Sequence, residues 1–67
     1  MKQRYIVASA WGRINPDNNQ AEVRAVLSSV LADWEDDALA QTRTICEKES
    51  PGWSLDSWIV RPLISLV

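Results

Sequence analysis

The first segment of the chain, residues 3–13, reads QRYIVASAWGR, and its mostly apolar residues fall into two sets that alternate along the chain. One alternating set is Tyr5, Val7, Ser9 and Trp11, and the other is Ile6, Ala8 and Ala10. Successive side chains of a β-strand point to opposite faces, and β-branched and aromatic residues dominate this segment. The pattern therefore predicts a strand over residues 3–13.

The second segment, residues 20–32, has two interpretations. If Asn15 capped a helix and Pro16 opened it, six apolar residues would share one helical stripe: Val23, Val26, Leu27, Val30, Leu31 and Trp34. As a strand, the same segment places Val23, Ala25, Leu27 and Leu31 on one face and Glu22, Arg24, Val26, Ser28 and Val30 on the other. Periodicity alone favours the helix. We nevertheless predict a strand, because the first strand needs a neighbour to satisfy its backbone groups.

A strand at residues 20–32 requires a hairpin turn before it. The sequence NPDN, residues 15–18, fits a type I turn with Pro16 at the second position. We expect Asn18 to take the left-handed conformation of a bulged hairpin loop.

The third segment, residues 33–49, has the spacing of a helix. Asp33 and Asp36 resemble a capping box, and the apolar stripe that follows is Ala38, Leu39, Thr42, Ile45 and Cys46. The sequence SPGW, residues 50–53, ends the helix because proline cannot lie in its interior.

A last strand is predicted over residues 57–65, with Pro62 favouring a sheet edge because it cannot donate a ladder hydrogen bond. The expected fold is a single α+β domain of residues 1–67 with β-β-α-β order. A short hairpin and a returning helix give a three-stranded antiparallel sheet of strand order 2-1-3. The helix covers one face, and nothing in the chain covers the other.

Composition argues against catalysis. The chain has no histidine, one cysteine (Cys46) and two widely separated glycines, so it lacks the usual general base, a conventional zinc site and a phosphate-binding glycine loop. We expect a protein that is not an enzyme and that uses no cofactor and no metal. Without a membrane-length apolar run or a signal-peptide pattern, we expect a soluble, intracellular protein.

The formal net charge of −2 has the wrong sign for a domain that follows nucleic-acid phosphates. A protein partner is therefore the better default.

The second half of the chain resembles a known family, the small phage-encoded inhibitors of bacterial RNA polymerase. The resemblance rests on the stretches VLADWEDDALAQ and SPGWSLDSWIVRPL. The matching positions are Ala32, Asp33, Asp36, Asp37, Ala38 and Leu39, then Pro51, Gly52 and Trp53, then Val60, Arg61 and Pro62. The family has the same β-β-α-β order, which supports the strand prediction for residues 20–32. Small phage anti-CRISPR proteins are also similar, so the motif indicates fold more than target.

The resemblance implies a cytoplasmic protein in a bacterial host that inhibits RNA polymerase by occupying its surface. Arginines of the family's last strand contact the jaw of the enzyme, and Arg61 stands at one of those positions. Ile59 stands where the family has a second arginine, which puts the specific jaw contact in doubt.

Seven residues are the candidate partner-binding residues: Trp11, Asp33, Glu35, Asp36, Asp37, Trp58 and Arg61. The four acids also complement a helix dipole, and the tryptophans also suit a small core. If Trp11 or Trp58 points to the uncovered sheet face, it becomes a candidate anchor. Arg61 also suits an edge strand that must resist pairing.

Three other functions stay open. The chain is alternatively an anti-CRISPR protein that binds a ribonucleoprotein complex, or a homodimeric virion or assembly component that covers the bare sheet face with a second copy. It is alternatively a nucleic-acid-binding module, which requires Arg4, Arg13, Arg24 and Arg61 to gather on one face.

Overall fold

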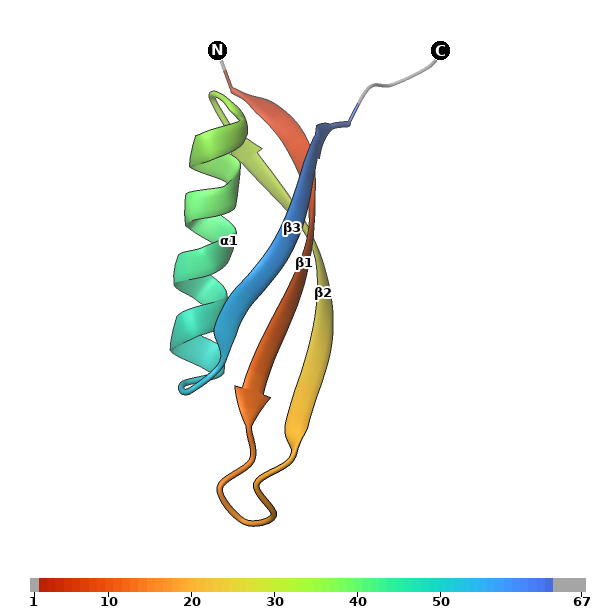
Figure 1. Ribbon diagram of the computed structural model, residues 1–67. Coiled ribbons are helices and arrows are strands. Elements are labelled where there is room, and N and C mark those ends of the chain that lie inside the picture. The colour runs from red at the N-terminus through yellow and green to blue at the C-terminus, as the bar shows by residue number, and fades with distance from the viewer. Residues whose placement is uncertain (1, 64–67) are drawn as a thin grey trace.

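A computed structural model describes residues 2–63 of the chain. The elements are β1 (Gln3–Ile14), β2 (Ala21–Ala32), α1 (Glu35–Glu49) and β3 (Ser54–Pro62). The three strands form one antiparallel sheet of order β2-β1-β3, and α1 lies along one side of it (Figure 1). The predicted α+β fold, its strand order and the strand at residues 20–32 are confirmed.

The β1–β2 hairpin is the longest pairing of the sheet. Its ladder runs without a register shift from Gln3 opposite Ala32 to Ile14 opposite Ala21. Asn15 closes the loop, because its amide donates to the carbonyl of Gln20 at 2.8 Å. The residue in the left-handed region is Asn19, with a φ of 57°, and not Asn18 as predicted. The side chain of Asn18 instead accepts a hydrogen bond from the Gln20 amide at 3.0 Å.

β3 pairs with β1 from Tyr5 opposite Pro62 to Gly12 opposite Ser54, with an irregularity between Ala10 and Trp11. The strand begins at Ser54, three residues before the predicted start, because the turn after α1 is short. The predicted end at residues 64 and 65 lies outside the described residues.

Pro62 lies on the outer side of β3, as expected for an edge strand. The Leu63 amide donates to the Arg4 carbonyl at 2.9 Å, and bonded pairs recur at every second residue of an antiparallel ladder. The backbone groups of Trp58, Val60 and Pro62 therefore point away from β1, where a missing N–H breaks no ladder bond.

The helix starts later than its sequence pattern indicates. Trp34 is the N-cap residue and no side chain caps the helix, so the predicted capping box of Asp33 and Asp36 is wrong. The Oδ2 of Asp37 instead accepts a hydrogen bond from the Asp33 amide at 3.3 Å, which ties the approaching chain to the first turn.

The core lies between α1 and the sheet. It comprises Tyr5, Val7, Ser9 and Trp11 of β1, Ala32 of β2, Ala38 and Thr42 of α1, and Val60 of β3. This β1 set is the larger of the two sets that alternation predicted. Small residues on α1 let the helix approach the sheet, and the indole N–H of Trp11 donates to Oγ of Ser9 at 3.0 Å, so the buried indole nitrogen has a partner.

The helix is much shorter than the sheet beneath it. The 15 residues of α1 span about 22 Å, whereas the 12 residues of β1 span about 40 Å. The hairpin therefore extends beyond the helix (Figure 1). Where the helix ends, the Trp53 ring closes the core: the guanidinium carbons of Arg13 and Arg24 lie 4.9 and 4.5 Å from its centroid. The Arg13 Nε also donates to Glu22 at 2.6 Å.

Candidate protein-binding surfaces

The sheet face opposite α1 carries an uncovered apolar surface, which we call the open face. The ladder register places these apolar residues on it: Ile6, Ala8, Ala10, Ile14, Val23, Ala25, Leu27, Leu31 and Ile59. Val23 is 77% exposed and Leu27 is 76% exposed. Apolar side chains that are this exposed on one face mark a surface whose burial by a partner lowers the free energy.

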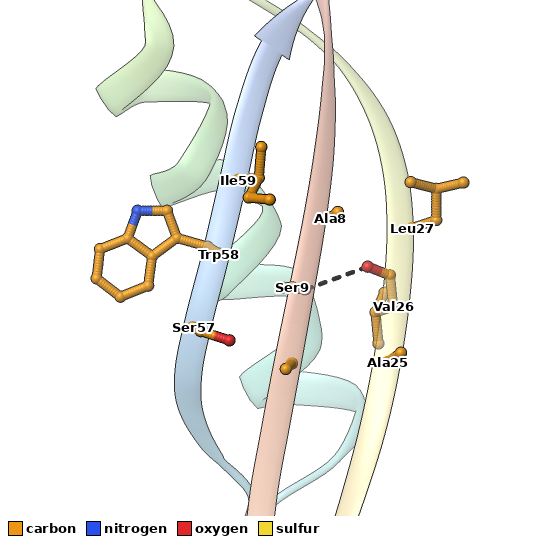
Figure 2. Close-up of a pocket in the computed structure, with 9 residues that line it drawn as sticks. Ala8, Ser9, Ala25, Val26, Leu27, Ser57, Trp58 and Ile59 are labelled. Atoms are coloured by element: carbon orange, nitrogen blue, oxygen red, sulfur yellow. Dashed lines mark hydrogen bonds between the residues drawn. The ribbon is translucent and has the colours of Figure 1, made fainter.

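The middle of the open face is hollow. Ala8, Ala10, Ala25 and Ser57 form the floor of a depression of about 430 Å³. Figure 2 shows Ile59 and Leu27 on either side of Ala8, with the Trp58 indole turned away from them beyond the outer edge of β3. The depression exists because large residues on β2 and β3 flank small ones on β1.

A second depression, the edge groove, lies between the outer edge of β3 and the first turns of α1. It has a volume of about 250 Å³, and its lining residues are Glu35, Asp36, Leu39, Trp58, Ile59, Val60 and Arg61. Trp58 pairs with buried Ser9, so its side chain lies on the helix side of the sheet, yet it is 52% exposed because β3 is the outer strand. Four of the seven predicted partner-binding residues meet here: Glu35, Asp36, Trp58 and Arg61.

Arg61 also protects the edge on which it lies. Its Nη1 donates to the carbonyl of Val60 at 2.8 Å, which is one of the carbonyls that point away from β1. The Arg61 guanidinium occupies that carbonyl, and Pro62 has no N–H to donate, so another strand has fewer groups to pair with at this edge. The geometry therefore supports a role in blocking edge pairing beside any role in binding.

The other two acids have structural contacts. Asp37 accepts hydrogen bonds from the Asp33 amide and from Nε2 of Gln41, both at 3.3 Å. The carboxylate of Asp33 lies 3.9 Å from Nζ of Lys2. Glu35 and Asp36 are exposed in the first turn, where they complement the helix dipole and face the edge groove.

Trp11 does not lie on the open face. It is 2% exposed beneath α1, so it is a core residue and cannot anchor a partner in this fold. Alternation already grouped it with Tyr5 and Val7, but the sequence did not say which of the two sets the helix would cover.

The arginines of the nucleic-acid alternative do not gather on one face. The register places Arg4 and Arg61 on the open side of the sheet, whereas Arg13 and Arg24 lie on the helix side against Trp53.

Sequence reasoning missed the contribution of Leu27, Leu39 and Ile59 to these surfaces. The signal was present for Leu27, because the more apolar set of residues 20–32 shares its face with Val23 and Leu31. For Ile59 the signal depends on register, which a bulge in β3 changes.

Residues 2–63 contain no cluster of three or more side chains suited to a metal ion. No helix in that range is long and apolar enough to cross a membrane. Desolvation, with a smaller effect from Glu49, raises the pKa of the Cys46 thiol, so its reactive thiolate form is disfavoured.

The fold and both surfaces can be set against known proteins. Comparisons with protein-family models, with curated proteins and with solved structures give no match in any of the three.

Proposed function

We propose that this protein is a small binding module that inhibits a bacterial nucleic-acid machine by occupying part of its surface, with the edge groove as the contact site. The observation that carries the proposal is the exposed Trp58 beside Arg61 at the border of that groove. Tryptophan and arginine are the residue types that most often dominate binding energy at interfaces.

Charge supports a basic partner surface. Glu35 and Asp36 stand at the other border of the edge groove, and the whole chain carries a net charge of −2. Acidic groups at an interface increase the association rate with basic surfaces, and nucleic-acid machines carry such surfaces where they hold phosphates. The acids would then compete with the nucleic acid for the same basic groups.

The resemblance of residues 32–39 and 51–62 to phage inhibitors makes RNA polymerase the first candidate target. It brings Asp36 and Arg61 to matching positions, and both line the edge groove. A CRISPR surveillance complex is the second target to be tested, since that resemblance extends to anti-CRISPR proteins.

Binding to purified bacterial RNA polymerase tests the proposal directly. We expect saturable binding together with inhibition of transcription, and a dissociation constant at least tenfold higher for Trp58→Ala. A tenfold change corresponds to about 1.4 kcal/mol, the loss typical of truncating one interface anchor. Arg43→Ala is the matched control, because Arg43 is exposed on α1 and its side chain bonds Glu47 on the same helix.

A charge-neutral double variant tests the role of the acids. Glu35→Gln with Asp36→Asn should slow association and flatten its dependence on salt, with a smaller effect on dissociation. If folded wild-type protein binds neither the polymerase nor a surveillance complex, the proposal fails. If Arg43→Ala weakens binding as much as Trp58→Ala, the edge groove is not the contact site.

A further inference from the structure

We propose that the open face is the interface of a symmetric homodimer, in which two sheets pack face to face with their β1 strands antiparallel. This interface adjoins the edge groove, with which it shares Ile59 and Arg61. A dimer formed in this way leaves Trp58 exposed, because its side chain lies on the helix side of the sheet at the outer edge of β3. The dimer is therefore compatible with the function proposed above and does not depend on it.

The first argument is the arrangement of large and small side chains in rows across the open face. The register puts Leu27, Ala8 and Ile59 in one row and Ala25, Ala10 and Ser57 in the next. A two-fold axis that crosses the strands between these rows brings each row opposite the other row of the second copy. Leu27 then meets Ala25 of the second copy, and Ile59 meets Ser57.

The rows on either side follow the same rule. The row of Ser29 and Ile6 comes opposite the row of Val23 and Gly12 in the second copy. Ile6 then fills the space above a residue that has no side chain, and Val23 lies above a serine. Large side chains opposite small ones are what two interdigitating sheets need at their spacing of about 10 Å.

The second argument is charge. Register assigns the open face two charged residues among those described, Arg4 and Arg61, and both lie toward the same end of the sheet. An antiparallel dimer places these pairs at opposite ends of the assembly. A dimer with parallel β1 strands would bring four arginines together, and like charges in contact oppose association.

The third argument is area. A sheet about 40 Å long and three strands wide offers about 500 Å² on one face, so two copies bury about 1,000 Å² between them. That is the lower limit for a specific interface, so we expect a weak dimer that dissociates on dilution.

Sedimentation equilibrium tests the oligomeric state. We expect wild-type protein to approach twice the chain mass of 7.6 kDa as its concentration rises through the micromolar range. Leu27→Glu should raise the dissociation constant at least tenfold, and it should fold normally because Leu27 is 76% exposed in the single chain. Ile45→Glu is the matched control, because Ile45 is half-exposed on α1, which lies on the side of the sheet opposite the open face. A monomer at all concentrations, or a Leu27→Glu protein that still dimerises, would overturn the proposal.

Distance measurement between spin labels tests the symmetry. A label at Asp17→Cys, in a Cys46→Ala background, reports the separation of the two hairpin tips. Because the axis lies beside Ser9, the antiparallel dimer predicts about 45 Å between the tips, whereas parallel strands would bring them within about 20 Å. A short distance would reject this geometry. Failure of polymerase binding would leave both measurements unchanged, and so the two proposals are tested independently.

Discussion

Thr42 carries a buried hydroxyl whose removal should stabilise the protein. Its side chain is 2% exposed in the core, and among the described residues nothing forms a hydrogen bond with its Oγ1. A buried polar group without a partner costs about 1 to 3 kcal/mol, because it loses its hydrogen bonds to water on folding. Thr42→Val keeps the branched shape and replaces the hydroxyl with a methyl group.

The expected gain follows from these terms. Threonine and valine have similar helix propensities, so the substitution changes little in the helix itself. Removing the desolvation cost should therefore raise the free energy of unfolding by about 1 to 2 kcal/mol. In a domain of about this size, 1 kcal/mol shifts the melting temperature by about 4 to 8 °C.

Urea and thermal unfolding followed by circular dichroism measure this gain. Thr44→Val is the matched control on the same helix, because the Thr44 hydroxyl is exposed and donates to the Ala40 carbonyl at 2.9 Å. We expect the control to be neutral or slightly destabilising. If Thr42→Val lowers stability instead, its hydroxyl has a partner such as a buried water molecule, and the reasoning is refuted.

Three further changes test other parts of the fold. Trp53→Leu should destabilise the protein by about 1 to 2 kcal/mol, because it loses two cation–π contacts of about 0.5 to 1 kcal/mol each. Thermal unfolding measures this loss, with Trp34→Leu as the control because Trp34 is exposed. A hydrogen bond from Arg13 lowers the pKa of Glu22 below its ordinary value of 4.5, so its contribution to stability is complete above 4.5 and is lost as the pH falls through the lowered value. Urea midpoints between pH 7 and pH 3 should therefore fall less steeply for Glu22→Gln than for wild type. Gly52→Ala should cost about 1 kcal/mol in the same unfolding assay although the space around it is empty, because Gly52 has a φ of 89°.

The hairpin and the helix were within reach of sequence reasoning, although periodicity misled at residues 20–32. The apolar residues there fit a helical stripe, and only the need of β1 for a partner favoured the strand. The 12-residue ladder with β2 gives the backbone groups along one edge of β1 hydrogen-bond partners. A helix at residues 20–32 would have left those groups of β1 without partners. Tertiary pairing therefore overrode local periodicity.

The candidate site was harder to predict, because it depends on which face each strand turns to the helix. Alternation sorted Trp11 and Ile6 into opposite sets correctly, but it did not say which set α1 would cover. On β2 the helix covers the more polar set, and the apolar set with Leu27 is left outside. Trp58 and Glu35 are 23 residues apart in the chain, so their meeting at the edge groove required the register of β3.

The shortness of α1 relative to β1 divides the molecule into two regions that should exchange their amide hydrogens at different rates. Around Val7 the ladder is shielded by the helix, so its amides become available to solvent only when the whole domain unfolds. The part of the β1–β2 hairpin that extends past the end of α1 is held only by the pairing of its two strands. The tip between Ile14 and Ala21 can therefore fray while the rest of the domain stays folded. A segment inserted into that loop should therefore be tolerated without disturbing the part of the sheet that packs on α1.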